Sequence, residues 1–333
     1  MNATASILLI RLKSIGDVVF TLPAANVVRD NFPDARITFL TSKENEPMLQ
    51  GFPAVTNTIA LDRARFQSGN PKAFLGEVFS LLRRLRSGKF SLVIDFQGYG
   101  ETEWLAWWSG APQRWGSVYR AARGWTYSRG VRRNSRIHPV RWNLSFLAQC
   151  GLKIGEVKNE FVLPEDALAA ARRFYSDQKL DVAKPVIFIQ PFSSSPQKNW
   201  PLQNYLAVAR HWRARGVQIL FGGGPTDRPA LEPARAEGFG IAAGQPLLVS
   251  LGLAKLATFM LGGDTGLGHL AVAAGQRVVM VMMGNQFGFC VPFQHPEWAV
   301  VPAQGTDITT ISLADVLAAT TRAFNESTGN ASC

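Results

Sequence analysis

The sequence predicts an α/β protein made of two doubly wound parallel sheets in tandem. Its 333 residues exceed what one ordinary hydrophobic core organises, which indicates two domains. Short, nearly all-apolar strands alternate with helical stretches, a pattern typical of parallel sheets covered by helices on both faces. The alternation restarts after a polar stretch at 176–184, which places the domain boundary near residue 180.

The first half of the chain begins with a clear strand–loop–helix pattern. Three apolar runs are expected to form strands, at 6–11, 36–40 and 90–95. The loop Lys13–Asp17 follows the first of them and leads into a helix with Pro23 near its start. An amphipathic helix is expected over 74–85.

The second half repeats this organisation. Strands are expected at 186–189, 217–221 and 277–282. A helix over 204–215 should end at Gly216, and 247–261 is expected to form a strand, a turn and a helix in that order. The tail at 325–333 is expected to fray.

The amino-acid composition indicates what kind of partner the protein binds and in what kind of cellular compartment it folds. With 47% hydrophobic and 18% charged residues the chain should fold, and its net charge of +11 favours an anionic partner or surface. Its three cysteines lie far apart, which indicates a reducing compartment and no structural zinc. No stretch approaches the roughly 20 apolar residues of a membrane-spanning helix, so we expect a soluble or peripheral protein.

The segment 104–142 departs from the α/β pattern. It contains no acidic residue, six of the nine tryptophans, and eight arginines at 114, 120, 123, 129, 132, 133, 136 and 141. One interpretation is an exposed basic loop with a few core aromatics. The other is a site for an anionic amphiphile, in which guanidinium groups bind phosphate or carboxylate and indoles lie at a lipid interface. Arg63 and Arg65 could join such a site. Nucleic-acid binding proteins share these ingredients, but usually without a second, sugar-nucleotide-like domain.

The strongest local motif is the glycine-rich run 262–275. Its small residues would let a ligand approach the backbone, and a helix beginning near Gly266 would direct free amides toward a diphosphate. Asp264 and Thr265 could simply cap that helix, a role that is compatible with binding. His269 would lie in the first turn and face the same crevice.

A second polar segment, 190–201, follows directly after an expected strand, where ligands bind in open α/β sheets. Its three serines and Lys198 supply the hydroxyls and the compact positive charge that suit a pyrophosphate. The alternative is a polar surface loop in which Trp200 and Pro201 begin the next helix. The glycine turn at 222–227 also follows a strand and could reach a ribose or a base.

The loop Lys13–Asp17 is the third candidate segment. Taken alone, Asp17 fits a helix N-cap. The motifs GxSxG, HExxH and GxxxxGK[ST] are absent from the sequence, which argues against a serine hydrolase, a zincin and a P-loop NTPase.

Together the three segments resemble glycosyltransferase family 9, the ADP-heptose:lipopolysaccharide heptosyltransferases. The likeness begins at Ile7–Pro23, which contains the family's strand, GD loop and LP helix. It continues with the Ser/Lys/Trp-Pro segment at 193–201 and closes at 264–271, near the family's DTGxxHLAAA signature. Order and spacing match across residues 5–320. Within the last motif, Gly268 stands where family members often carry a bulkier or hydroxyl residue.

The resemblance implies a GT-B fold, in which two Rossmann-like domains face a central cleft. An N-terminal acceptor-binding domain would span 1–180 and a C-terminal nucleotide-sugar-binding domain 181–325. Asp17 would be the general base, and Lys198 would stabilise the departing ADP. The residues expected to contact the donor are Ser194, Ser195, Lys198, Gly223, Asp264, Thr265, Gly266, Leu267 and His269. Those expected to hold the anionic acceptor are Lys13, Arg63, Arg65, Arg120 and Arg123.

We therefore expect an inverting transfer of a heptose or a related sugar from an ADP-sugar to an anionic lipopolysaccharide core or lipid A acceptor. The four histidines are scattered and no Asp-x-Asp is present, so we expect no metal and no cofactor besides the ADP-sugar co-substrate. We further expect a cytoplasmic monomer, peripheral on the inner face of the cytoplasmic membrane, that binds no nucleic acid. Two other functions stay open: a GT-B-fold sugar-nucleotide epimerase and a non-catalytic polyanion-binding protein.

Overall fold

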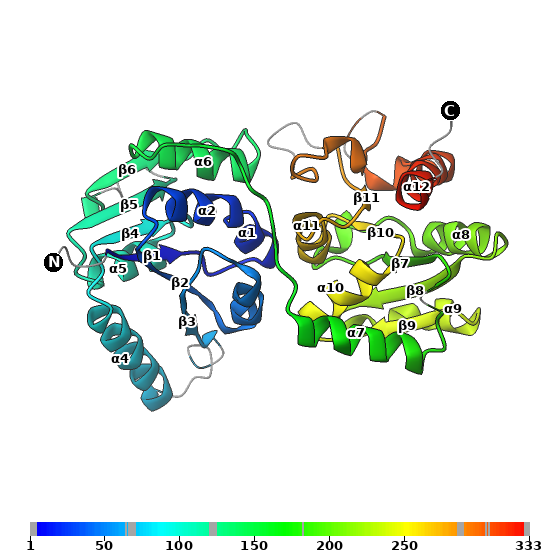
Figure 1. Cartoon of the computed structure of the whole chain (residues 1–333), viewed down its shortest axis with the longest axis horizontal. Coiled ribbons are helices and arrows are strands. Elements are labelled where there is room, and N and C mark those ends of the chain that lie inside the picture. The colour runs from blue at the N-terminus through cyan, green and yellow to red at the C-terminus, as the bar shows by residue number, and fades with distance from the viewer. Residues whose placement is uncertain are drawn as a thin grey trace. The chain divides into compact units, whose positions relative to one another are not determined.

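The computed structural model describes residues 5–329 apart from 64, 66–70, 120–124, 182, 285–289, 304 and 306. The chain divides into two compact units, Met1–Val162 and Leu163–Cys333. Each unit is a parallel six-stranded sheet with helices packed on it, as Figure 1 shows, so the predicted α/β fold with two doubly wound sheets is confirmed.

The first sheet has the strand order β3-β2-β1-β4-β5-β6, and its strand pairs are parallel. Its strands are β1 Ser6–Ile10, β2 Arg36–Ser42, β3 Asn57–Leu61, β4 Leu92–Asp95, β5 Gln113–Val118 and β6 Arg129–Arg132. The direction of winding reverses between β1 and β4. In open α/β sheets, ligands bind beyond the carboxyl ends of strands at such a switch point. The loops that follow β1 and β4 therefore occupy the expected ligand position.

The described helices of the first unit are α1 Ile15–Val19, α2 Leu22–Asn31, α4 Pro71–Ser87, α5 Gly100–Trp108 and α6 Pro139–Gln149, with a 3₁₀ segment at Lys43–Gly51. Of these, α2 and α4 were predicted from their apolar spacing, whereas α1, α5 and α6 were not. Pro23 lies in the first turn of α2, where its missing N–H costs no intrahelical bond. Val27 and Val28 are fully buried on the inner face of that helix, as expected.

The second sheet repeats the topology of the first, with the order β12-β11-β10-β7-β8-β9. Its strands are β7 Val186–Gln190, β8 Gln218–Gly223, β9 Gly240–Ala243, β10 Phe259–Gly263, β11 Val278–Val281 and β12 Ala299–Val300. Its helices are α7 Glu165–Asp177, α8 Leu202–Arg213, α9 Glu232–Ala236, α10 Leu247–Leu256, α11 Gly266–Ala273 and α12 Leu313–Thr328. Here the switch point lies between β7 and β10, so the loops after these two strands meet at one edge.

Two expectations about the second half were wrong. Residues 247–261 form a helix followed by a strand, not the reverse, because the apolar run at its start belongs to the buried helix α10. The tail also stays helical as far as Thr328, and Gly329 ends α12 with a left-handed backbone, φ 73°. Residues 330–333 lie outside the described part of the chain.

The division between the units falls after Val162, rather than near residue 180. Helix α7 belongs to the second unit because it packs against α10: Tyr175 donates a hydrogen bond to the carbonyl of Leu253 at 2.9 Å. Gly252 permits the contact, since a Cβ there would lie 2.8 Å from the Cβ of Ala171. The polar stretch 176–184 therefore follows the first helix of the second unit and does not separate the two units.

A substitution at Gly262 would test how closely the backbone packs at the switch point of the second sheet. A Cβ at this position would lie 2.8 Å from the carbonyl oxygen of Gln190 on the neighbouring strand. We expect Gly262→Ala to lower the free energy of unfolding by about 1–3 kcal/mol, because a backbone neighbour yields little to overpacking. Urea unfolding measures the change.

Gly76→Ala is the matched control, since Gly76 lies in α4 and a Cβ there meets nothing within 4 Å. It should stabilise the protein by up to about 1 kcal/mol through helix propensity. Equal effects of the two substitutions would contradict the packing argument.

Candidate functional site

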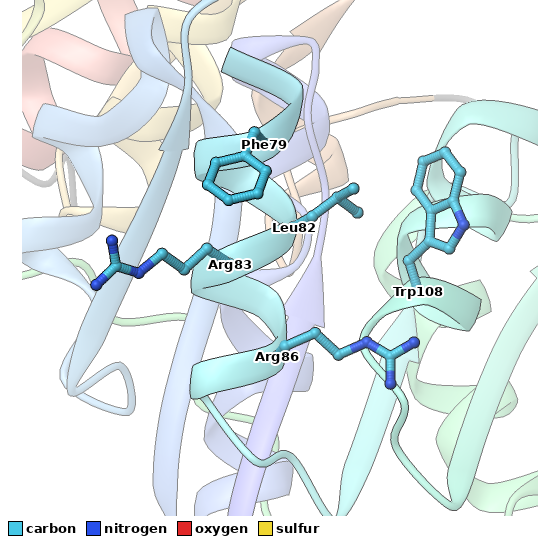
Figure 2. Close-up of a pocket in the computed structure, with 5 residues that line it drawn as sticks. All are labelled: Phe79, Leu82, Arg83, Arg86 and Trp108. Carbon is cyan, nitrogen blue, oxygen red and sulfur yellow. The ribbon is translucent and has the colours of Figure 1, made fainter. Parts of the chain in front are cut away.

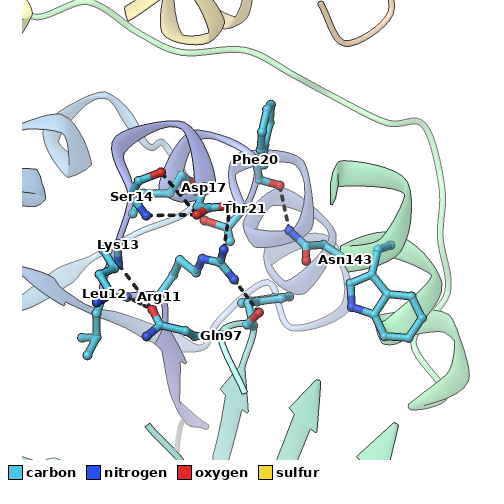
Figure 3. Close-up of polar contacts among 12 residues, drawn as sticks. Arg11, Leu12, Lys13, Ser14, Asp17, Phe20, Thr21, Gln97 and Asn143 are labelled. Carbon is cyan, nitrogen blue, oxygen red and sulfur yellow. Dashed lines mark hydrogen bonds and ion pairs between the residues drawn. The ribbon is translucent and has the colours of Figure 1, made fainter. Parts of the chain in front are cut away.

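In the first unit the candidate site is the loop after β1, shown in Figure 3. One Asp17 carboxylate oxygen lies 2.6 Å from Nη2 of Arg11. The other accepts hydrogen bonds from the backbone N–H of Ser14 at 3.1 Å and from its hydroxyl at 3.2 Å. The interpretation of Asp17 as the N-cap of α1 was wrong: the N-cap is Ser14, and Asp17 lies at the third position of the helix, from which its carboxylate accepts from Ser14. Its side chain is nevertheless 35% exposed, which leaves the carboxylate accessible to a ligand.

The ion pair with Arg11 holds the Asp17 carboxylate in place. The Arg11 side chain is only 6% exposed, and its Nη1 donates to the carbonyl of Phe96, directly after β4, at 2.8 Å. Arg133 donates to the same carbonyl at 3.3 Å and lies over the ring of Tyr119. Burial lowers the pKa of Arg133, while the negative charge of Asp17 counteracts that shift. Asp17 therefore lies in a positive environment made by two arginines.

Sequence reasoning missed Arg11 and Gln97 as parts of this site. Gln97 is fully buried, and its side-chain oxygen accepts from the backbone N–H groups of Leu12 at 2.9 Å and Lys13 at 3.3 Å. It thereby ties the loop after β4 to the loop after β1. One signal was available for Arg11: a cation placed directly after a fully buried strand requires a partner carboxylate.

The five residues expected to hold an acceptor have different positions. Lys13 is exposed in the Asp17 loop. Arg63 is half-buried, and its Nη1 atom is buried without a hydrogen-bond acceptor among the described residues. Arg65 is paired instead, with Asp62 at 3.6 Å and Glu77 at 3.5 Å. Arg120 and Arg123 lie outside the described residues.

The expectation that the Trp- and Arg-rich segment 104–142 departs from the α/β pattern was wrong, because the segment contains the end of α5, the strands β5 and β6, and the start of α6. Trp115 and Trp142 belong to the core. Arg114 and Arg129 donate to backbone carbonyls, those of Thr126 and Cys150 respectively. The core tryptophans fit the first interpretation in part, and the exposed tryptophans are those at 104, 107 and 125. The second interpretation, a site for an anionic amphiphile, stays a prediction.

In the second unit, the loop after β7 meets the start of α11, as the motifs predicted. Nζ of Lys198 lies 2.7 Å from one oxygen of Asp264, and Nε2 of His269 lies 2.9 Å from the other. Lys198 is 45% exposed, whereas His269 is 4% exposed. The Asp264 carboxylate therefore joins a buried imidazole to an ammonium group that reaches solvent.

Asp264 is strongly held in its charged form. Burial alone would raise its pKa, but the hydrogen bonds and charges of His269 and Lys198 outweigh burial and lower the pKa to about 2. The carboxylate is thus ionised at neutral pH and supports a positive charge on Lys198. Asp264 does not cap α11; Thr265 does, because its hydroxyl accepts from the N–H of Gly268 at 3.0 Å.

The start of α11 is shaped for close approach of a ligand. Gly266 is the first residue of the helix, and the N–H groups of a first helical turn have no intrahelical partner. Leu267 is buried, so its backbone rather than its side chain is available there. Close packing explains why residue 268 is a glycine. A Cβ there would lie 3.0 Å from the methyl carbon of Met280 and 3.3 Å from the hydroxyl of Thr265.

The remaining expected contacts lie in the loops after β7 and β8. Ser193 stabilises its loop by donating to the carbonyl of Ser195 and the side chain of Asn199. Ser194 is exposed and Ser195 is half-buried. Gly223 ends β8, beside a turn that Asp227 closes by accepting from the N–H of Gly224 at 2.7 Å.

The last features of the described structure concern metal-holding side chains and helices long enough to span a membrane. Among the described residues, no group of three or more His, Cys, Asp or Glu side chains is arranged to hold a metal ion. Within the same part of the chain, every helix is too short or too polar to cross a bilayer.

The pKa of Asp264 gives a pH-dependent prediction. Its folded pKa of about 2 lies below the ordinary value of 3.8 for an aspartate, so its stabilisation is present above pH 3.8 and is lost as the pH falls toward 2. We expect Asp264→Asn to lower the free energy of unfolding by about 2 kcal/mol at neutral pH. The gap to the wild type should close in acid, as urea titrations at several pH values can measure.

The exposed Asp177 supplies the control, and Asp177→Asn should change stability little at any of these pH values. A gap for Asp264→Asn that persists unchanged at pH 2 would contradict the ion-pair assignment.

Comparison with known proteins identifies the family. Residues 78–298 match the model of glycosyltransferase family 9 (heptosyltransferase). The lipopolysaccharide core heptosyltransferase OpsX of Haemophilus influenzae is 23% identical over 230 residues, which cover 68% of this chain but only 62% of that protein.

Two solved structures share the fold. The glycosyl transferase family 9 protein from Veillonella parvula superimposes with a TM-score of 0.85 at 21% identity, covering 98% of this chain and 99% of that one. The Escherichia coli heptosyltransferase WaaC with ADP gives 0.75 at 18% identity, covering 96% and 99%. The family model spans most of the chain, and the chain therefore belongs to glycosyltransferase family 9, the heptosyltransferases.

Proposed function

We propose that this chain is an inverting glycosyltransferase that moves a heptose or a related sugar from an ADP-sugar to an anionic lipopolysaccharide core or lipid A acceptor. The observation that carries the proposal is the Lys198–Asp264–His269 arrangement at the switch point of the second sheet. It combines a solvent-reaching ammonium group with the free amides of a helix start, which together suit the diphosphate of a nucleotide sugar.

The second unit would bind the donor. Lys198 and the N–H groups of Gly266 and Leu267 would bind the diphosphate, while Ser194 and Ser195 would donate hydroxyl hydrogen bonds to it. Gly223, at the end of β8, would leave room for the nucleoside. Asp264 would orient Lys198 and keep it protonated, and His269 and Thr265 would hold Asp264 and the helix start in place.

The first unit would supply the base and the acceptor site. Asp17 would remove the proton from an acceptor hydroxyl as that oxygen forms its bond to the anomeric carbon. The bond from this carbon to the diphosphate would break, and ADP would leave with the electron pair, stabilised by Lys198 and the start of α11. Attack opposite to the leaving group inverts the anomeric centre.

The charges of the first unit suit an anionic acceptor. Arg11 holds the Asp17 carboxylate toward solvent, and the positive surroundings of Asp17 would attract phosphate or carboxylate groups. Arg63 has a buried guanidinium nitrogen that lacks an acceptor among the described residues, which makes it a candidate contact together with Lys13. Arg65 would have to leave its two carboxylate partners to take part.

Family membership favours transfer over the two alternatives, an epimerase and a non-catalytic polyanion-binding protein. The same proposal includes metal-independent catalysis, which predicts that transfer persists in the presence of EDTA. It also includes a cytoplasmic monomer that associates with the inner face of the cytoplasmic membrane, where a lipid-linked acceptor would be found.

Asp17→Asn tests the base. The amide keeps the shape of the side chain but cannot accept a proton, so we expect the transfer rate to fall by about 10²–10⁴-fold. ADP affinity, measured by calorimetry, should stay at the wild-type value because the donor is assigned to the second unit. Asp34→Asn, at an exposed aspartate of the same unit, should leave both unchanged.

A rate for Asp17→Asn within about tenfold of the wild type would remove Asp17 from the role of base, given the usual size of such effects.

Lys198→Ala tests the diphosphate site. One charged hydrogen bond is worth about 1.5–3 kcal/mol, so ADP affinity should fall about 10–100-fold. Lys184→Ala, at an exposed lysine of the same unit, should not change it. Titration with UDP and GDP beside ADP identifies the nucleotide, and a protein that ignores all three would be a binding module of another kind. Unchanged ADP affinity in Lys198→Ala would indicate that the loop after β7 is a polar surface loop that does not bind the diphosphate.

A further inference from the structure

Helix α4 exposes apolar side chains in a way that a soluble helix does not need. Its inner face is buried in the core of the first unit through Leu81 and Leu85. Its outer face carries Leu75, which is 63% exposed, and Phe79, which is 71% exposed. These two residues are four apart and so lie on one side of the helix.

This outer face borders a cavity between α4 and α5, shown in Figure 2. The cavity has a volume of about 420 Å³, and it is lined by Phe79, Leu82, Arg83, Arg86 and Trp108. Three of these side chains are apolar and the other two are arginines, and all come from α4 except Trp108, which ends α5. The cavity is therefore amphipathic, and its charged part is positive.

A tryptophan cluster continues the apolar surface from this cavity along α5. The ring of Trp108 lies 5.8 Å from that of Trp104, which in turn lies 5.9 Å from both Trp107 and Trp125. Trp104 and Trp107 are each 43% exposed, and Trp125 is 67% exposed. Large exposed aromatic groups in contact with one another mark an interaction surface rather than a chance exposure. We call the outer side of α4 with this cluster the α4–α5 face.

The charge of the α4–α5 face specifies its partner. Arg83 and Arg86 form no ion pair with any carboxylate in the described part of the chain. They lie about one helical turn apart on α4, and both line the cavity together with Phe79 and Leu82. In Figure 2 Arg86 points toward Trp108 and Arg83 points away from it. Arginines beside exposed indoles and phenyl rings match the interface of an anionic bilayer, where phosphates meet the first methylene groups.

We propose that the α4–α5 face docks on an anionic phospholipid bilayer. Phe79 and the exposed tryptophans insert at the level of the headgroups, while Arg83 and Arg86 bind lipid phosphates at the mouth of the cavity. The docking surface rests on the proposed function, which supplies the lipid-linked acceptor, but its first test measures vesicle binding and does not use the transfer reaction.

The test is co-sedimentation of the full chain with vesicles of phosphatidylcholine, with and without phosphatidylglycerol. The wild type should bind the anionic vesicles, more strongly at low salt, and should not bind pure phosphatidylcholine. Arg83→Ala with Arg86→Ala should weaken binding about 25-fold, because each basic residue near an anionic leaflet contributes about fivefold. Phe79→Ser should weaken it about tenfold by removing an inserted ring.

Arg172→Ala with Arg173→Ala is the matched control, since these two arginines are exposed on α7 in the second unit and the change in net charge is the same. This control should bind like the wild type. Equal losses in the two double variants, or binding of the wild type to neutral and anionic vesicles alike, would overturn the proposal.

A second measurement separates this proposal from the proposed function. Transfer to a delipidated, water-soluble acceptor should proceed at the wild-type rate in Arg83→Ala with Arg86→Ala. Loss of that activity would place the two arginines in the transfer site and overturn the docking surface. If the wild type transfers no sugar at all, the proposed function fails, while the vesicle results still decide the docking surface.

Discussion

The candidate site depends on one topological constraint, the reversal of winding in each parallel sheet. In both sheets the first and fourth strands in chain order are neighbours, β1 with β4 and β7 with β10. The loops that leave these neighbours begin at the same edge and lead into separate helices, so polar side chains can gather there without disturbing the core. Asp17 follows β1, Gln97 follows β4, Lys198 follows β7 and Asp264 follows β10. Residues far apart in sequence are adjacent because the strands that carry them are adjacent.

Each switch point holds one carboxylate against cations, but the two arrangements differ in which charge is buried. In the first unit the buried partner is Arg11, and the carboxylate of Asp17 remains partly exposed. In the second unit the carboxylate of Asp264 is the less exposed partner, and the ammonium group of Lys198 reaches solvent. The first arrangement therefore presents a negative group and the second a positive one. A base and an anion-binding group are the two chemistries that a displacement with a diphosphate leaving group requires.

The strands β1, β2, β4, β7, β8 and β11 could be predicted because buried parallel strands are short apolar runs. The polar segments after some of them marked the switch points. The residues that support the site were missed. Gln97 acts through hydrogen bonds to backbone N–H groups of the loop after β1, and no spacing in the sequence reveals such partners. Arg11 left one signal, a cation directly after a fully buried strand, which was not used. The order of helix and strand at 247–261 was also missed, since an apolar run fits a buried helix as well as a buried strand.

The segment 104–142 shows why composition alone cannot locate a charged surface. Its arginines are many, but Arg114, Arg129 and Arg133 donate to backbone carbonyls within the first unit. These guanidinium groups donate to the carbonyl groups at the ends of strands and loops. They therefore contribute less positive charge to the surface than the number of arginines suggests.

Helix α4 has the opposite property. Its periodicity predicted an amphipathic helix with one buried face, yet its outer face is apolar at Phe79 and positive at Arg83 and Arg86. A helix with an apolar residue on its solvent side gains nothing from that exposure in water. Covering the Phe79 ring with other apolar groups would offset the unfavourable free energy of its exposure to water. The adjacent arginines favour a partner whose surface is negatively charged. The exposed apolar and basic side chains of α4 and the tryptophans of α5, rather than the total charge of the chain, thus favour a membrane contact.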